Sequence, residues 1–331
     1  MLKLKDSLLD GDTALENVKK PSYEELFDRN YGVLSETQQE NLRKTRILIV
    51  GCGGIGGTVA IILARSGIEN FILVEFDTYD TSNINRQISC FADTLGRNKA
   101  EVIGDDIRRI NPNADVEIYP RLLTHDEIAQ LIPKVDVVFP AADDFAFSIL
   151  VFREAKRQGK PALFVVPSGT WANVSIILPD GPTIEQVEGI PSLETYEELA
   201  QMFQTKKYKL GTYYYTFLAG WRIDYFRRFL DDNLPPTQLC PVVWICSSIG
   251  AFEVIKLVSR RWKPVAAPRF WFITQNKIKI MNINGISIHT LLLWQRRLHW
   301  MLFQTPLKGL LEKLQNFCWK YYYKGMKGRE R

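Results

Sequence analysis

Cysteine and histidine are scarce in this chain of 331 residues, which contains five cysteines and three histidines. No two cysteines are separated by two residues, the spacing of a zinc ribbon, so that class of protein is excluded. So few cysteines also favour a reducing compartment over a secreted, cross-linked protein. With 46% hydrophobic and 24% charged residues, the composition is typical of a soluble globular protein.

Long hydrophobic runs are also missing. The longest apolar stretches fall short of the roughly 20 residues that a membrane-spanning helix needs. The N-terminal sequence Met-Leu-Lys-Leu-Lys-Asp has no apolar signal core. We therefore expect a cytoplasmic protein without a spanning helix.

Charge is distributed unevenly along the chain. Residues 292–331 contain nine Lys or Arg and two Asp or Glu, whereas the whole chain has a net charge of only +5. The segment 284–331 also has the aromatic, amphipathic and basic composition of a helix at a membrane interface. We expect this tail to contact a membrane surface or another anionic partner, or to pack as a helix on the protein's own body.

From residue 46 onward, apolar runs alternate with helical patterns. The runs predict buried strands at 46–50, 71–74, 116–119, 135–139 and 161–166. Helical patterns lie at 58–65, 99–110, 145–158 and 242–259, and a terminal hairpin is predicted at 270–273 and 278–280. This alternation predicts the α/β class, with a doubly wound, mostly parallel Rossmann-like sheet and helices on both faces.

A glycine-rich loop follows the first predicted strand. The segment 51–57 reads Gly-Cys-Gly-Gly-Ile-Gly-Gly and opens into a helix, which directs backbone N–H groups at a phosphate. The glycines expected to bind nucleotide are Gly51, Gly53, Gly54 and Gly56. Glu75 ends the next strand, where an acidic side chain accepts hydrogen bonds from a ribose. No Gly-x4-Gly-Lys-Ser/Thr motif is present, so the chain is not a P-loop NTPase.

Two cations after this loop favour ATP over a dinucleotide. Arg86 and Lys99 follow Glu75 in sequence, and cations there neutralise charge on a leaving pyrophosphate, whereas hydride transfer has no need of them. Asp143 follows the fourth strand, at the edge where such sheets bind ligands, and a carboxylate there suits Mg²⁺.

Taken together, these residues resemble the ThiF/MoeB/HesA adenylyltransferases, relatives of the ubiquitin-activating enzymes. The resemblance runs from about residue 23 to 256, with a weaker match to 283. The segments that carry it are 29–32, Gln39, 51–57, 75–77, 82–87, 96–99, 110–112 and Asp143. It implies an N-terminal helical segment at 1–45, an ATP-binding adenylation domain at 46–283 with an insertion at about 181–240, and the tail 284–331.

The resemblance also implies roles for individual residues. Such enzymes use Mg-ATP to convert a carboxylate into an acyl-adenylate with release of pyrophosphate. Glu75 would hold the ribose, and Asn83, Arg86 and Lys99 would hold the phosphates. Asp77 and Gln87 would also bind the nucleotide. Asp143 would hold Mg²⁺. Arg29 resembles the arginine that these proteins send into the partner subunit's ATP site, which implies a homodimer; its spacing from the glycine loop is shorter than in MoeB.

No cysteine occurs between Cys90 and Cys240, where a nucleophile of the crossover loop is expected in many relatives. Cys240 and Cys246 flank an apolar run and are expected to be small buried hydrophobes. The cysteine pairs that bind zinc in many relatives are absent. We therefore expect adenylation without a covalent thioester, and no zinc.

The substrate stays open at this point. Candidate carboxylates are the C-terminus of a ubiquitin-like or sulfur-carrier protein, a ribosomal peptide, and the threonylcarbamoyl group of a tRNA. Two other classes are a non-catalytic binding subunit and a NAD-dependent oxidoreductase, which shares the glycine loop.

Overall fold

The centre of the protein is an eight-stranded sheet in the order β3-β2-β1-β4-β5-β6-β7-β8. The structure is a computed structural model, and it describes residues 20–205, 219–231 and 234–285, with single residues between 306 and 317. The strands are β1 (Arg46–Val50), β2 (Asn70–Val74), β3 (Asp115–Tyr119), β4 (Val137–Pro140), β5 (Ala162–Ser168), β6 (Trp171–Ile177), β7 (Arg269–Thr274) and β8 (Lys277–Asn282). Nearly all predictions for the tail 284–331 concern residues outside this description.

The sheet has a parallel half and an antiparallel half. Strands β3, β2, β1, β4 and β5 pair in parallel, and β6, β7 and β8 are added by antiparallel pairing. From β1 the chain builds β2 and β3 on one side, and then β4 and β5 on the other. The order therefore reverses between β1 and β4, where open α/β sheets bind ligands. The predicted α/β class and Rossmann-like sheet are confirmed.

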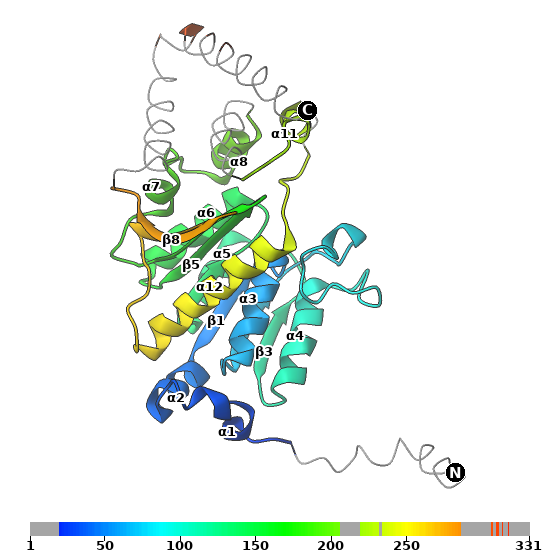
Figure 1. The fold of residues 1–331 in the computed structure, drawn as a ribbon, viewed down its shortest axis with the longest axis vertical. Helices are drawn as coiled ribbons and strands as arrows, with labels where there is room; N and C mark the ends of the chain where they lie inside the picture. Colours follow the sequence, from blue (N-terminus) through cyan, green and yellow to red (C-terminus); the bar gives the residue numbers. More distant parts are fainter. Residues whose placement is uncertain are drawn as a thin grey trace, which may run out of the picture.

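Helices cover both faces of the sheet (Figure 1). The face with α3 (Gly54–Arg65), α4 (Lys99–Ile110) and α12 (Cys240–Ser259) buries Ile47 and Ile49 of β1. The opposite face, with α5 (His125–Leu131), α6 (Phe145–Arg157) and α8 (Tyr196–Gln204), buries Leu48 and Val50. Successive side chains of a strand point to opposite faces, so one apolar run serves two cores. Two further helices of the described chain are α7 (Ile184–Glu188) and α11 (Ile223–Asp231). Short 3-10 turns lie at Thr81–Asn83 and Ile132–Lys134.

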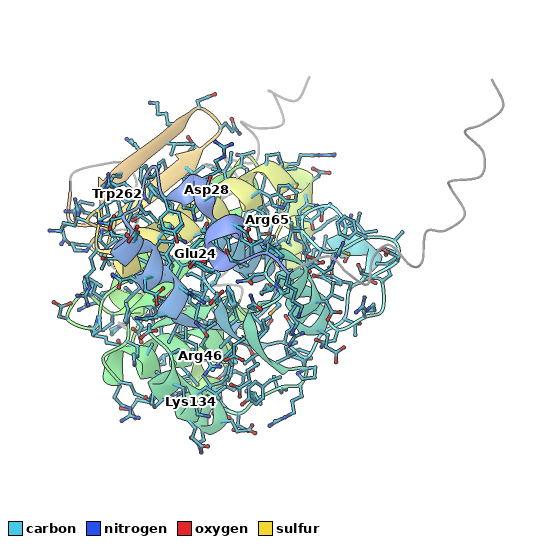
Figure 2. All side chains as sticks on the ribbon, turned by 90° about the horizontal axis from the view of Figure 1, so that it is seen from below. Glu24, Asp28, Arg46, Arg65, Lys134 and Trp262 are labelled. Atoms are coloured by element: carbon cyan, nitrogen blue, oxygen red, sulfur yellow. The ribbon has the colours of Figure 1, made fainter. Side chains whose placement is uncertain are left out.

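The N-terminal elements pack at the end of the sheet where the parallel strands begin. They are α1 (Tyr23–Leu26), a 3-10 turn (Asp28–Asn30) and α2 (Glu36–Lys44). Figure 2 views the molecule from this end, where Glu24, Asp28, Arg65 of α3 and Arg46 of β1 are all in view. Asn30 Nδ2 donates to the Ser66 carbonyl at the C-terminal end of α3, 3.0 Å away.

Several expected boundaries were wrong. Helix α3 begins inside the glycine run, at Gly54 rather than 58, because glycine's small size lets a helix start there against the neighbouring loop. Strand β6 and helix α5 were not predicted. Strand β6 alternates apolar and polar residues from Ala172 to Ile176, and all of its residues are buried in the structure.

One helix bears on the expectation that the chain has no spanning helix. Helix α12 has the length and hydropathy of a membrane-spanning helix, by composition alone. In the structure it packs on α3, β5 and β6 and buries the Glu253 carboxylate, which accepts from Trp271 Nε1 and from Lys256. This packing buries residues such as Val243, Cys246 and Val254, whereas Trp244, Ile245 and Phe252 of the same helix are exposed.

Candidate nucleotide site

The glycine loop leads from β1 into the N-terminus of α3, at the carboxyl edge of the parallel strands. Gly51 has φ of 100°, and a Cβ there would lie 2.5 Å from the backbone N of Ala142. A Cβ on Gly56 would lie 1.8 Å from the Gly51 carbonyl oxygen. The N-cap residue of α3, Gly53, makes no side-chain capping bond. The first N–H groups of α3 are thus left for an anion, with the helix dipole favouring negative charge.

Glu75 and Asp77 lie beside this loop, just after β2. One oxygen of Glu75 accepts from the Cys52 N–H and the other from the Asp77 N–H, each at 3.0 Å. A carboxylate has about four acceptor positions, so Glu75 retains acceptor capacity beyond these two bonds. Asn98, the N-cap of α4, donates to the carbonyls of Glu75 and Asp77 and fixes this segment.

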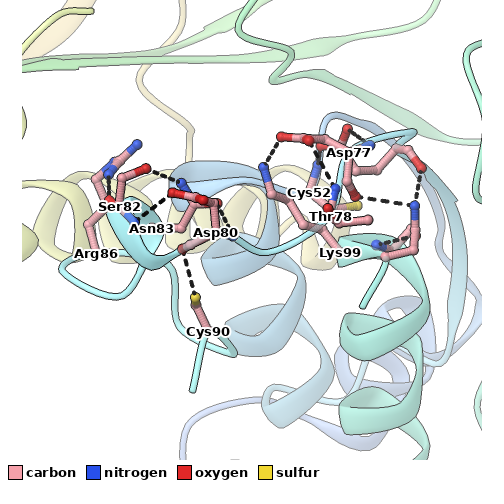
Figure 3. A network of polar contacts seen from close by, with 12 residues as sticks. Cys52, Asp77, Thr78, Asp80, Ser82, Asn83, Arg86, Cys90 and Lys99 are labelled. Atoms are coloured by element: carbon pink, nitrogen blue, oxygen red, sulfur yellow. Dashed lines mark hydrogen bonds and ion pairs between the residues drawn. The ribbon is translucent and has the colours of Figure 1, made fainter. Parts of the chain in front are cut away.

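Lys99 is almost completely buried, with 3% of its surface exposed, whereas the Asp77 side chain is about half exposed. Its ammonium forms a short ion pair with Asp77 (Figure 3). Lysine carries three donors, so a ligand at this edge could receive others. A buried lysine paired with one exposed carboxylate is suited to binding an anion, because the surrounding protein already reduces its hydration.

Arg86 lies on the other side of the loop. A Cβ on Gly54, the first residue of α3, would lie 3.6 Å from Arg86 Cγ. The guanidinium donates to the Ser82 carbonyl and to Asn85 Oδ1, both at 2.8 Å. Figure 3 shows Arg86 and Asn83 on the turn that follows Asp80. The structure therefore places the Arg86 side chain beside the first residue of α3.

Gln87 and Asn83 are both buried near this turn. Gln87 is 5% exposed, and its Nε2 is the atom nearest to a Cβ built on Gly53, at 3.7 Å. Its Oε1 is buried and has no hydrogen-bond partner in the described structure. Asn83 Oδ1 accepts from the Asp80 N–H at 3.2 Å, so this side chain shapes the turn. An unpartnered buried amide oxygen beside an uncapped glycine loop fits a site that a polar ligand completes.

Asp143 and Arg29 occupy very different places. Asp143 is exposed three residues after β4, beside the loop that Gly51 contacts, and makes no hydrogen bond or ion pair with described residues. The part of the chain that the structure describes contains no group of three His, Cys, Asp or Glu side chains arranged for a metal. Arg29 is exposed beside Asn30, at the far end of α3. Twelve residues of helix separate the ends by about 18 Å, so Arg29 does not reach the glycine loop of its own chain.

The described thiols differ in their surroundings. Burial raises the pKa of Cys52 well above its usual range, and it also raises the pKa of Cys90. Burial raises the pKa of Cys246 to about 12. Cys240 is only partly buried, at the first residue of α12, so the expectation that it is buried was wrong. Cys318 lies outside the described residues.

Sequence reasoning missed three side chains that hold the site from a distance. Gln238 Oε1 accepts from Arg86 Nε at 2.9 Å, and Trp244 Nε1 donates to the Arg86 carbonyl at 3.0 Å. Tyr196 donates to Asp144, the N-cap of α6, at 2.6 Å. They come from the predicted insertion and from α12, more than 50 positions away in sequence, so no local pattern indicates them.

Residues 27–289 match the ThiF family. The chain belongs to the ThiF family. Among curated ThiF-family relatives, it is 39% identical to the molybdopterin-synthase adenylyltransferase of Escherichia coli over 231 residues, which cover 69% of this chain and 78% of that protein. It is 28% identical to the tRNA threonylcarbamoyladenosine dehydratase of Bacillus subtilis, over 56% of this chain and 70% of that protein.

Some ThiF-family relatives are matched over a smaller part of their length. The chain is 33% identical to the probable adenylyltransferase/sulfurtransferase MoeZ of Mycobacterium tuberculosis over 37% of its own residues, which span 31% of MoeZ. Among solved structures, E. coli MccB with ATP is similar in fold, with a TM-score of 0.59 and 23% identity over 80% of this chain and 73% of MccB. The family and the fold are thereby established.

Proposed function

We propose that this ThiF-family protein is an ATP-dependent adenylyltransferase that activates a carboxylate. The observation that carries the proposal is the placement of two cations at the carboxyl edge of the sheet: Arg86 lies beside Gly54 at the uncapped N-terminus of α3, and the buried Lys99 pairs with Asp77 just after β2. A triphosphate needs such a set, because its phosphates and its leaving pyrophosphate both carry negative charge. The names of adenylyltransferases among the relatives support the same reading.

The proposed reaction forms a bond between a carboxylate oxygen and the α-phosphorus of ATP, and breaks the α–β phosphoanhydride bond. Glu75 and Asp77 accept from the ribose hydroxyls. Backbone N–H groups of 53–56, together with Arg86, Lys99, Asn83 and Gln87, bind the phosphates. The products are an acyl-adenylate and pyrophosphate.

Mg²⁺ would bind at Asp143, which is exposed at the same edge of the sheet and has no partner among the described residues. A single carboxylate suits Mg²⁺, which takes its other ligands from water and phosphate oxygens and would neutralise phosphate charge. No residue pair for zinc is proposed.

The acceptor class is proposed from the relatives. A sulfur-carrier or ubiquitin-like C-terminus fits the molybdopterin-synthase and sulfur carrier protein adenylyltransferases, which activate or are named for such partners. The test is ATP–pyrophosphate exchange with purified acceptors of each class: a carrier ending in Gly-Gly, a short peptide, and threonylcarbamoylated tRNA. Exchange with the carrier alone supports the proposal, and exchange only with tRNA reassigns the protein to the dehydratase branch. No exchange with any acceptor, despite bound ATP, would favour a non-catalytic subunit.

We also propose a homodimer in which Arg29 serves the ATP site of the partner subunit. Arg29→Ala and Lys99→Ala enzymes, each inactive alone, should regain exchange when mixed and re-associated, because a mixed dimer holds one intact site. Failure of mixed dimers to regain activity would place Arg29 outside the site.

Location and the tail 284–331 remain proposals of the same kind. We propose a cytoplasmic protein whose tail touches an anionic membrane surface. Deletion of residues 287–331 should reduce sedimentation with anionic liposomes and leave exchange unchanged. Equal sedimentation before and after deletion would remove the membrane proposal.

A further inference from the structure

Three neighbouring groups accept hydrogen bonds from the guanidinium of Arg86. Arginine has five N–H donors. Nε donates to Gln238 Oε1, and Nη1 donates to the Ser82 carbonyl and to Asn85 Oδ1. No partner of Nη2 occurs among the described residues. Two donors on one nitrogen therefore remain for a ligand, and the other contacts determine where they point.

Gln238 contributes to this arrangement twice. Its side chain accepts from Arg86 Nε at 2.9 Å, and its backbone carbonyl accepts from Asn85 Nδ2 at 3.3 Å. Asn85 in turn accepts from Arg86 Nη1. Gln238 thus contacts Arg86 directly and also orients a second side chain that contacts it.

Gln238 is itself fixed from the opposite side, by the turn between β5 and β6. The Gly169 N–H donates to the Thr237 carbonyl at 2.7 Å, and Gly169 forms a backbone bridge with Gln238. Gly169 has φ of 57°, and a Cβ there would lie 2.2 Å from the Ala219 carbonyl oxygen. The segment 237–238 therefore lies against a turn that admits little else than glycine.

We infer that Gln238 is a positioning residue for the nucleotide site, which acts by directing Arg86 Nη2 toward the phosphates. A free arginine side chain has many rotamers, and ordering it on binding costs conformational entropy. An acceptor at Nε removes much of that cost before ATP arrives, as a preorganised contact should. This inference rests on the proposed function, because it assumes that Arg86 meets a phosphate.

The test is a double-mutant cycle read by equilibrium binding, so that no acceptor is needed. Gln238→Met keeps the side-chain volume and removes the acceptor. We would measure the Kd of a non-cleavable ATP analogue with Mg²⁺, by calorimetry, for the full chain, Gln238→Met, Arg86→Met and the double variant. Gln130→Met, on the exposed surface of α5, is the matched control.

Gln238→Met should raise Kd about tenfold, as expected for loss of one hydrogen bond to a charged group. In the Arg86→Met background the same change should have no further effect, since Gln238 acts through Arg86. An equal loss of affinity in both backgrounds, or no loss in either, would overturn the inference. If Gln238→Met does not fold, Gln238→Asn, which retains the amide but falls short of Nε, completes the same cycle.

Failure of the proposed function would look different. Wild-type binding with the expected cycle, but without exchange for any acceptor, would leave the positioning role standing and remove the adenylation. Wild-type protein that binds no ATP analogue at all would overturn both.

Discussion

The two halves of the sheet contribute to the candidate site in different ways. The parallel half carries the groups that would touch nucleotide: the glycine loop after β1, Glu75 and Asp77 after β2, and Lys99 at the start of α4. The segment before α12, which bridges to the turn between β5 and β6, supplies Gln238, and α12 itself supplies Trp244; both side chains contact Arg86. Binding groups therefore come from one half, and much of the orientation of Arg86 comes from segments beyond it. Substitutions of the binding groups should remove contacts to the nucleotide, and substitutions at Gln238 and Trp244 should change how Arg86 is oriented.

The largest effect is expected at Gly56. In Gly56→Ala the new methyl group would lie 1.8 Å from the Gly51 carbonyl oxygen, so the loop must open. Its backbone N–H groups would then no longer point toward the phosphates. We expect binding of an ATP analogue to be lost by about a hundredfold or more. Gly309→Ala is the control, because a methyl group there meets nothing within 4 Å and the residue lies outside the loop. Similar affinities of the two variants would show that loop geometry does not decide binding.

Lys99→Ala should reduce pyrophosphate exchange by about 10²–10³-fold, because it removes one preorganised charge from the transition state. The fold should survive, since Asp77 is about half exposed and remains hydrated without its partner. Lys44→Ala, at an exposed lysine of α2, controls for loss of a surface charge. Exchange within tenfold of wild type would contradict the role of Lys99.

Asp143 and Asp144 are neighbours that should separate function from stability. Asp143→Asn should raise the half-saturating Mg²⁺ concentration of exchange about tenfold and leave the melting temperature unchanged. Asp144→Ala should lower the free energy of unfolding by about 1 kcal/mol, because Asp144 caps α6 through the Phe147 N–H. A Mg²⁺ titration that shifts in Asp144→Ala but not in Asp143→Asn would reverse the assignment.

Trp244→Phe tests the single hydrogen bond that a side chain of α12 donates to Arg86. The change removes the indole N–H that donates to the Arg86 carbonyl and keeps an aromatic ring on α12. We expect a loss of ATP-analogue affinity of about threefold, smaller than at Gln238, because the contact reaches the backbone and not the guanidinium. A loss of ATP-analogue affinity as large as that expected for Gly56→Ala would mean that Trp244 contacts the nucleotide directly.

The slowest reaction with an alkylating reagent is expected at the buried thiols. Because burial raises their pKa, Cys52, Cys90 and Cys246 hold little thiolate at neutral pH, and alkylation should quicken only as the pH rises toward those values. Cys240, which is partly exposed, should be labelled first among these four by iodoacetamide, as mass spectrometry would show. Rapid labelling of Cys52 at pH 7 would require an open glycine loop.

Local patterns located every strand of the parallel half, although helix α5 was missed. The segment 51–57 lies between a continuous apolar run and a helical pattern, and such a sequence has few alternatives to a strand–turn–helix unit. Glu75, Arg86 and Lys99 could be placed near the loop because parallel strands end at one edge of a sheet. The structure agrees, although it adds the ion pair of Lys99 with Asp77, which no spacing rule indicates.

The antiparallel half was harder to predict. Strand β6 pairs with β5 and β7, and its residues 172–176 alternate apolar and polar side chains, but both kinds are buried, so the alternation does not mark a solvent-facing side. Helix α12 was predicted as a helix, but neither its full length nor its partly exposed Cys240 was expected. Packing against α3 and the sheet decides which residues of α12 are buried, because the sequence of α12 is apolar on nearly all sides.

The sequence by itself determined the α/β class, the nucleotide loop and the residue types that surround it, because these depend on short-range periodicity and on backbone freedom at glycine. Only the tertiary structure decided that Gln238 meets Arg86, a contact between residues 152 positions apart. It also decided that Arg29 lies at the opposite end of α3 from the loop of its own chain. Such contacts depend on how β5, β6 and α12 pack against β1 and α3, and packing of distant segments leaves no periodic trace in the sequence.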